Sequence, residues 1–438
     1  MRIAIIGAGI SGLTLYLFLE KLGLTQHLDV TIYEAKSLAA DRDNRASDAT
    51  DQTYMSGLSL GFAHNGLSVL CRLSSELHDE VLRTGRTVTS WRLSSARGWT
   101  LATVDTSGDG TQGLMIGRHS FWQCLRSRVP EDIVSYRKVT RVEVKPVGNV
   151  IHFTDGESVE ADLVVGGDGI WSVVRRAIFD TQAEIAEYEY APHYEGLVGV
   201  GGTVADVALR NVPAGQMNAV FGRNGFFGYG RSGPPSSPST GNGEKAVWWS
   251  TYNLKDCPLD WRDINTDEAT RQLEVRHKSW KDETIQAILQ DPKIEGLWPT
   301  FTTPLLPTWE RQGCVLIGDA AHALQPSSGQ GASMALEDAE ALALLLAHNV
   351  AGDQGNGHRL ACKQYSDLRM PRLAEVHKKA QETASMKQDM SLFGEFVMYF
   401  AVWLINVLHL NQAYNRALYG YDVPKEVDRF LAAKAEVL

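Results

Sequence analysis

The stretch that decides the fold reads Cys314-Val315-Leu316-Ile317-Gly318-Asp319-Ala320-Ala321-His322 and resumes as Pro326-Ser327-Ser328-Gly329-Gln330-Gly331-Ala332-Ser333. A short apolar run ends at a Gly-Asp pair, a loop containing Pro and Gly follows, and residues 334–347 are rich in Ala and Leu. This order predicts a buried strand, a loop and a helix. It places the carboxylate of Asp319 at a strand tip, beside free N–H groups of a helix N-terminus that favour an anionic ligand.

Bulk composition limits the classes of protein to which the chain can belong. Its 438 residues are 44% hydrophobic, and its formal net charge at pH 7 is -10. The length predicts two domains, or one domain with a large insertion. The acidic balance argues against nucleic acid or an acidic membrane surface as a main partner. The five cysteines never form C-x-x-C, so we expect reduced thiols, no metal site and a cytoplasmic location.

The N-terminus contains a second informative pattern. A strand-like run opens the chain, Gly7, Gly9 and Gly12 follow with G-x-G-x-x-G spacing, and Glu34 closes the next apolar run. The first glycine permits a tight turn, the second lets a pyrophosphate approach the backbone, and the third lets helix and strand pack closely. Glu34 can accept hydrogen bonds from a ribose. The pattern predicts a dinucleotide-binding unit.

Residues 162–168 predict a second strand that ends at an acidic residue. The apolar run ends at Asp168, and Ser172 is placed to cap the helix after it. Because Asp168 and Asp319 each lie beside glycine at the end of a predicted strand, we expect them at neighbouring tips of one parallel sheet. Residues 139–161 predict a β-meander, since two hairpin signals separate three short apolar runs.

The middle and the C-terminal part of the chain differ from the rest. Four runs, at residues 197–204, 217–221, 226–229 and 247–252, predict an antiparallel sheet, and residues 266–290 predict amphipathic helix. Residues 396–405 are uninterruptedly apolar but too few for a membrane span, which needs about 20. We expect a buried C-terminal helix there, with a monotopic membrane contact or a dimer surface as the alternatives.

Three motifs together resemble the single-component FAD-dependent monooxygenases with the p-hydroxybenzoate hydroxylase fold, especially the salicylate hydroxylase-like and zeaxanthin epoxidase-like members. They are Gly7-x-Gly9-x-x-Gly12 with Glu34-Ala35-Lys36, Asp168-Gly169-x-x-Ser172-x-Val174-Arg175, and Gly318-Asp319-Ala320-Ala321-His322 with Pro326 and Gly329-Gln330-Gly331. The chain departs from the family pattern at residues 323–325 and 327–328, which would line the pocket over the flavin.

The resemblance implies an α/β fold with a GR2-type, Rossmann-like FAD-binding domain, an inserted antiparallel-sheet substrate domain and C-terminal helices. The implied FAD-binding domain comprises residues 1–75, 105–182 and 300–358. The implied substrate domain comprises residues 76–104 and 183–299, and residues 359–438 form a C-terminal helical region.

The resemblance also implies the cofactor, FAD, and the residues that hold it. These are Gly7, Gly9 and Gly12 for the pyrophosphate; Glu34, with Lys36 nearby, for the adenosine ribose; Arg118 for the ribityl-phosphate region; the backbone of Val139 for adenine; Asp168 near the pyrophosphate; Asp319 for the ribityl or pyrophosphate portion; and the amides of Gly331 and Ala332 at the flavin pyrimidine ring. Gly329 is also implied as a cofactor-binding residue, without a particular part of FAD.

The implied reaction is an NAD(P)H- and O2-dependent insertion of one oxygen atom, through a flavin C4a-hydroperoxide, into an aromatic or alkene substrate. An indole-type or polyketide secondary metabolite is the expected substrate. Candidate pocket residues, each equally compatible with core packing, are Tyr194, Asn218, Phe227, Tyr229, Trp248, Trp249, Tyr252 and Pro326. Because side chains alternate along a strand, Trp248 and Tyr252 are predicted to share a face opposite Trp249.

The alternatives are another FAD enzyme on the same scaffold, such as a halogenase or a reductase, and a non-catalytic flavin-binding redox sensor. The tryptophan-rich stretch of flavin halogenases is missing. The expected partners are a small hydrophobic or aromatic substrate and O2, without nucleic acid or membrane contact. The chain is expected to be a monomer or a homodimer.

Overall fold

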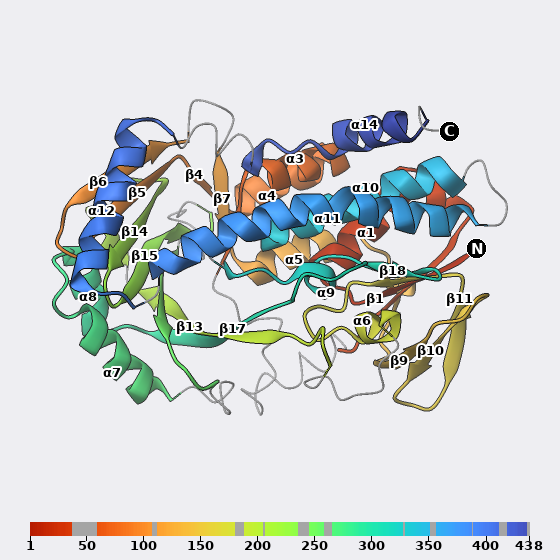
Figure 1. The fold of residues 1–438 in the computed structure, drawn as a ribbon, viewed down its shortest axis with the longest axis horizontal. Helices are drawn as coiled ribbons and strands as arrows, with labels where there is room; N and C mark the ends of the chain where they lie inside the picture. Colours follow the sequence, from red (N-terminus) through yellow and green to blue (C-terminus); the bar gives the residue numbers. More distant parts are fainter. Residues whose placement is uncertain are drawn as a thin grey trace, which may run out of the picture.

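The structure is a computed structural model that describes residues 1–36, 59–106, 112–179, 188–204, 206–234, 245–257, 265–326, 329–350, 356–387, 389–410 and 418–435. Ser327 and Ser328, which depart from the family pattern, therefore lie outside the described residues. Two main sheets lie at opposite ends of an elongated molecule, and the long helix α11 (Gly357–Ala384) runs between them (Figure 1).

A six-stranded sheet contains the N-terminus and has the order β18-β19-β12-β1-β2-β8. Its strands are β1 (Arg2–Ile6), β2 (Asp29–Tyr33), β8 (Val134–Ser135), β12 (Leu163–Gly166), β18 (Glu310–Arg311) and β19 (Cys314–Leu316). The strand β1 pairs in parallel with β2 and β12, and β12 pairs in parallel with β19. The prediction that Asp168 and Asp319 follow neighbouring parallel strands is therefore confirmed.

Helices surround this sheet, some of them in contact with its strands and others packed on neighbouring helices. They include α1 (Ile10–Lys21), α3 (His64–Leu73), α5 (Arg118–Arg126), α6 (Val173–Ile178), α9 (Asp319–His322), α10 (Gly331–Val350) and α14 (Val423–Ala435). The helices α1 and α10 pack against each other and against the sheet, and their buried residues belong to one hydrophobic core.

A seven-stranded sheet forms the other end of the molecule, with the order β17-β13-β16-β15-β14-β5-β6. Its strands are β5 (Ser90–Ser95), β6 (Thr100–Asp105), β13 (His193–Val204), β14 (Gln216–Gly222), β15 (Gly225–Ser232), β16 (Lys245–Asn253) and β17 (Ile294–Thr302). Neighbouring strands are antiparallel, as predicted, except that β5 runs parallel to β14. Two helices, α7 (Thr266–His277) and α8 (Glu283–Gln290), pack on one face.

Two smaller sheets complete the arrangement. The predicted meander is confirmed as β9 (Val139–Glu143), β10 (Asn149–Phe153) and β11 (Ser158–Ala161). The other sheet joins β3 (Leu60–Phe62), β7 (Gly113–Ile116) and β4 (Arg86–Val88). Helix α4 (Ser75–Thr84) falls in the stretch expected in the substrate domain and packs against α3 and α5, at the end of the molecule that holds the six-stranded sheet.

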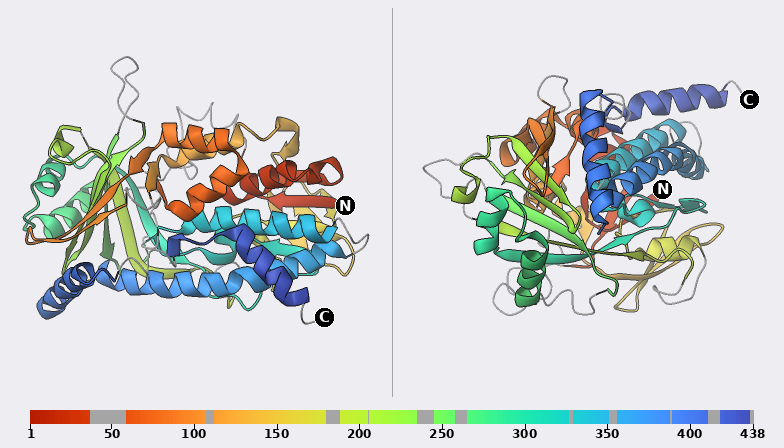
Figure 2. Two further views of the ribbon diagram at one scale, coloured as in Figure 1. Left: turned by 90° about the horizontal axis from the view of Figure 1, so that it is seen from above. Right: turned by 60° about the vertical axis from the view of Figure 1, so that its left-hand side comes forward.

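The apolar C-terminal segment forms the helix α12 (Leu392–Val407), but the prediction that this helix is buried is wrong. Only Glu395, Met398 and Tyr399 are buried, whereas the Phe393 side chain is 80% exposed. The physical reason is position: α12 packs on β6, at the end of the molecule farthest from the N-terminus (Figure 1, Figure 2). Apolar composition predicted the helix correctly but not its surroundings.

Candidate functional site

Four strand tips meet at one edge of the six-stranded sheet. Gly7 follows β1, Glu34 follows β2, Asp168 follows β12 and Asp319 follows β19. The Gly7 amide donates to the Tyr33 carbonyl at 2.8 Å. Gly7 has φ +103°, and a Cβ there would lie 2.5 Å from the Gly167 carbonyl oxygen. Only glycine fits this turn, so the strand tips approach one another closely.

The starts of α1 and α10 leave room for a ligand beside free backbone N–H groups. Among the described residues, no side chain caps the N-terminus of α1, and a Cβ at Gly9 would meet no atom nearer than 3.9 Å. A Cβ at Gly329 or Gly331 would meet nothing within 4 Å among the described residues. Both helix starts carry positive partial charge. The arrangement suits a long ligand with anionic groups at two points.

Glu34 is buried and lies against the glycine turn. One carboxylate oxygen, Oε2, accepts the Ala8 amide at 2.8 Å, and Oε1 accepts the Lys36 amide at 3.1 Å. The Glu34 side chain therefore holds the turn in place. Its contact with a ribose remains a prediction. Lys36 is brought next to Glu34 through its backbone.

Arg118 and Val139 lie beside the same edge. Arg118 is the exposed first residue of α5, and Trp122 one turn later donates its indole N–H to the Ala8 carbonyl at 2.8 Å. Val139 pairs with Phe153, whose ring centroid is 5.0 Å from that of Tyr33 at the end of β2. No sequence pattern pointed to Trp122, because an indole bond to a carbonyl more than a hundred residues away leaves no local signal.

Asp168 combines a structural bond with a free acceptor. Its Oδ2 accepts the Val173 amide at 2.7 Å, and Ser172 caps α6 as predicted, accepting the Arg175 amide at 2.9 Å. The other oxygen, Oδ1, is buried and has no partner among the described residues. Burial raises the pKa of Asp168 above its ordinary value. A buried acceptor without a donor fits a site that a ligand hydroxyl or a water completes.

Arg175 joins the two acidic tips from behind. It is fully buried, and its Nη1 donates to the Ala320 carbonyl at 2.8 Å, while Nε donates to the Tyr188 hydroxyl at 3.0 Å. It also donates to the Ile170 carbonyl. The motif from Asp168 to Arg175 includes this arginine, but the sequence did not predict a role for it. In the structure it ties the Asp168 loop to the turn that carries Asp319.

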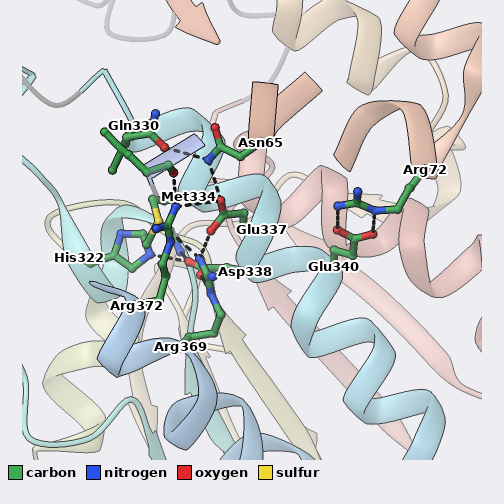
Figure 3. Close-up of polar contacts among 12 residues, drawn as sticks. Asn65, Arg72, His322, Gln330, Met334, Glu337, Asp338, Glu340, Arg369 and Arg372 are labelled. Atoms are coloured by element: carbon green, nitrogen blue, oxygen red, sulfur yellow. Dashed lines mark hydrogen bonds and ion pairs between the residues drawn. The ribbon is translucent and has the colours of Figure 1, made fainter. Parts of the chain in front are cut away.

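Asp319 itself is exposed, and the turn that presents it is held from beneath. Gly318 has φ +59°, and its amide donates to Asp338 Oδ2 at 2.9 Å. The same carboxylate binds His322 Nε2 and, through Oδ1, the Arg369 Nε at 2.9 Å (Figure 3). Asp338, on α10, therefore connects the Gly-Asp turn with α9 and α11.

The charges of this buried cluster support one another. Burial would raise the pKa of Asp338, but His322 and Arg369 outweigh it and hold that pKa at about 2. Burial would lower the pKa of His322, but the charge of Asp338 outweighs it, so the pKa is raised. Arg369 also pairs with Glu337 at 2.8 Å. We conclude that His322 is structural, because its ring nitrogen Nε2 is committed to Asp338.

The same cluster extends to the loop before α10. Asn65, on α3, donates its amide to Gln330 Oε1 at 2.8 Å and to Glu337 Oε1 at 2.6 Å (Figure 3). Gln330 is thereby fixed directly before Gly331 at the first turn of α10. A donor set held by a rigid buried network is preorganised, which strengthens electrostatic interactions with a bound charge.

Most of the predicted pocket residues lie on the sheet face covered by α7 and α8. Phe227 and Trp248 are 0% exposed and stack with ring centroids 5.5 Å apart, and Tyr229 donates to Asp282 Oδ2 at 2.8 Å. This placement favours core packing over substrate contact. The residues that pack on this side, directly or at its margin, are Tyr194, Asn218, Phe227, Tyr229, Trp248 and Tyr252.

The opposite face carries Trp249, which confirms the predicted alternation. Trp249 is half-buried and pairs with Gly201 and Gly228, and a Cβ at Gly228 would lie 2.3 Å from its indole. Trp298 likewise lies over Gly296, where a Cβ would be 1.9 Å from its ring. Trp249 packs against residues of β4 and β7 on one side and against a cluster with Met398 and Tyr399 of α12 on the other. The sequence did not predict this surface of tryptophans and glycines, because its glycines come from three separate strands.

The loop between α9 and α10 reaches the edge of this sheet. Gln325 donates to Glu195 Oε2 at 2.9 Å, and Glu195 also accepts a bond from Thr302. The Gln325 Oε1 is buried and without a partner among the described residues. Pro326, the last predicted pocket residue, is exposed next to it. The two sheets are therefore joined by polar groups close to the Gly-Asp turn.

Comparison with protein families identifies one match: residues 139–380 match the family described as FAD binding domain. Among curated proteins, the chain is 28% identical to salicylate hydroxylase from Pseudomonas putida, over 96% of each chain. It is also 28% identical to chloroplastic zeaxanthin epoxidase from Prunus armeniaca, over 88% of this chain and 55% of that protein.

Among solved structures, Klebsiella pneumoniae HpxO complexed with FAD and uric acid superimposes with a TM-score of 0.76. The two chains are 19% identical, and the match covers 95% of this chain and 96% of the other. At this identity the likeness concerns the fold, and it confirms the predicted architecture.

Proposed function

The chain belongs to the FAD binding domain family, and from that membership we propose that it is a flavoprotein monooxygenase that uses NAD(P)H and O2 to place one oxygen atom on an aromatic or alkene substrate. One observation carries the proposal. The acidic tips Asp168 and Asp319 and the open start of α10 lie at one sheet edge, and the half-buried Trp249 of the other sheet packs against residues of β4 and β7.

The described residues fit FAD. Gly7 and Gly9 would hold the pyrophosphate at the start of α1, Glu34 would hold the ribose, and the buried Oδ1 of Asp168 offers the acceptor that a bound hydroxyl or water needs. Asp319, exposed at the neighbouring tip, would bind the ribityl or pyrophosphate portion. When bound, FAD supplies the transfer of electrons and the activation of oxygen; the protein supplies binding, orientation and electrostatics.

The start of α10 would stabilise the charge of the reduced cofactor. Gly331 and Ala332 open this helix, and a helix N-terminus typically stabilises an anion by about 0.3–1 kcal/mol, and by up to about 2 kcal/mol when partly buried. The cluster around Asp338 keeps these donors in place without rearrangement. Rigid donors in a site that excludes water act more strongly than flexible ones.

The Trp249 face would bind the substrate. Trp249 and Trp298 are half-buried aromatic surfaces, and their rings lie over glycines of the same face, Gly228 and Gly296. A flat apolar ring can stack on such a surface. The Gln325 Oε1, buried without a partner among the described residues, would accept an N–H or O–H of the substrate. These features favour an aromatic molecule with one donor group, as an indole-type compound has.

The test begins with the purified protein and its visible absorbance. We expect an oxidised flavin, and we expect Asp319→Ala to weaken FAD binding, while Asp79→Ala, which removes an exposed aspartate of α4, leaves it unchanged. Aromatic compounds are then screened for NAD(P)H consumption, with mass detection of one added oxygen.

Three outcomes contradict the proposal. A colourless protein that refuses added FAD contradicts the cofactor, and bound FAD without substrate-stimulated NAD(P)H oxidation indicates a redox sensor. A halogenated or reduced product indicates another flavoenzyme on this scaffold.

A further inference from the structure

The helix α12 presents an apolar surface that the proposed reaction does not use. Ten of the seventeen large apolar side chains that are exposed among the described residues lie between residues 392 and 410. They are Leu392, Phe393, Phe396, Val397, Phe400, Trp403, Ile405, Val407, Leu408 and Leu410. Scattered exposed apolar residues are ordinary, but a contiguous patch marks a binding surface.

Buried contacts fix one side of α12 to the rest of the fold, so the other side of the helix stays exposed. The Tyr399 hydroxyl oxygen lies 2.8 Å from both the Phe221 carbonyl oxygen and Glu395 Oε1, so its one proton donates to either of them. Arg97 pairs with the other Glu395 oxygen at 3.1 Å, and Ser391 caps the helix. Because Glu395 is the only Asp, Glu, Lys or Arg from residue 392 to residue 410, the exposed surface of this segment carries no fixed charge.

We propose that α12 lies on the surface of an uncharged lipid bilayer, because its exposed face fits a flat apolar phase. At 3.6 residues per turn, Phe393, Phe396, Val397, Phe400 and Trp403 fall within an arc of about 120°, wider than the seam of a helix pair. A planar apolar phase covers such an arc, whereas one partner helix covers only part of it.

The chemistry of the face also favours lipid over a second copy of the chain. Interfaces between proteins carry a polar rim and about one hydrogen bond per 100–200 Å². Among the side chains of the exposed arc, only Trp403 has a hydrogen-bonding group, its indole N–H. Tryptophan is typical of the interface between water and lipid. Arg97, whose guanidinium lies 4.7 Å from the centre of the Phe396 ring, borders the patch with a cation.

The length of the helix determines its orientation on the bilayer. Sixteen residues span about 24 Å at 1.5 Å per residue, less than the hydrocarbon core of about 30 Å. Consistently, none of the helices in the described part of the chain is long and apolar enough to cross a membrane. The helix therefore lies in the plane of the surface. The net charge of -10 gives no attraction to anionic lipid.

The experiment is co-sedimentation of the full, FAD-loaded chain with phosphatidylcholine vesicles at low and high salt. We expect binding that high salt does not weaken, because the contact is apolar. We expect the double variant F400E/W403E to lose at least tenfold in partition. F400L/W403L retains binding, and Val275→Glu, at an exposed valine of α7, is the matched control and leaves it unchanged.

Flavin absorbance and thermal unfolding establish that the variants fold. The inference is overturned if the wild-type chain stays in the supernatant, or if F400E/W403E sediments as the wild type does. A dimer that F400E/W403E breaks, with no binding to vesicles, assigns the face to a second copy instead. Vesicle binding does not depend on substrate turnover, so failure of the oxygenation assay leaves this result unaffected.

Discussion

The two faces of the seven-stranded sheet carry adjacent tryptophans with opposite surroundings. Trp248 is fully buried under α7 and α8 and stacks on Phe227, whose ring also contacts His277, whereas Trp249 is half-buried on the opposite face, against residues of β4 and β7. The two residues have the same chemistry and nearly the same position in the chain. Their surroundings differ because α7 and α8 cover one side of the strand, whereas the other side packs against residues of β4, β7 and α12.

The largest effect on stability is expected for Trp248→Ala. Truncating a fully buried aromatic residue leaves a cavity, and such changes cost about 3–5 kcal/mol. Chemical unfolding followed by fluorescence and circular dichroism measures the loss. A cost below about 1 kcal/mol means that the α7–α8 side is loosely packed and that the contrast between the faces is wrong.

Trp249→Ala is expected to act on turnover. Losing one stacking surface of the substrate lowers kcat/KM about 10- to 100-fold, equivalent to about 1.4–2.7 kcal/mol, while stability changes less than in Trp248→Ala. Steady-state kinetics with a substrate found in the screen, at equal FAD content, provides the measurement. If both variants leave turnover intact, neither tryptophan lines the site.

The smallest effect concerns pH and His277, on the covered face. Burial, reinforced by Arg276, lowers the pKa of His277 to about 3. The unfolded chain binds a proton near pH 6.5 and the folded chain does not, so stability is full above pH 6.5 and falls as pH decreases toward 3. The expected loss is about 1 kcal/mol between pH 7 and pH 5.5.

The variant His277→Asn tests this assignment. It is expected to remove that part of the pH dependence measured by chemical unfolding, because asparagine does not titrate. A wild-type chain whose stability rises on acidification over this range contradicts a buried neutral histidine.

The strand tips were accessible from sequence because their signals are local. Asp168 and Asp319 each follow an apolar run directly, and the parallel arrangement of such runs brings their ends to one edge. The glycine turn before α1 was equally local, since its spacing encodes a backbone geometry. The FAD cofactor and the fold class predicted from these motifs are confirmed, whereas the role of each residue stays a prediction.

Other features depend on contacts that leave no local pattern. Alternation predicted that Trp248 and Trp249 point to opposite faces, but α7 and α8, which decide which face is covered, come later in the chain. Arg369 lies 31 residues from Asp338, and no local pattern in either segment predicts the ion pair. A buried helix and an exposed helix can both be as apolar as α12, so composition alone did not predict that α12 is exposed.

The strand order has a consequence for synthesis of the chain on the ribosome. The strand β12 pairs with β1 on one side and with β19 on the other, so its second edge has no partner until residues 314–316 have emerged. Arg369, which completes the buried cluster, emerges later still. The strand tip that carries Asp319 can therefore form only when most of the polypeptide is available, and until then an apolar strand edge is open to aggregation or to a chaperone.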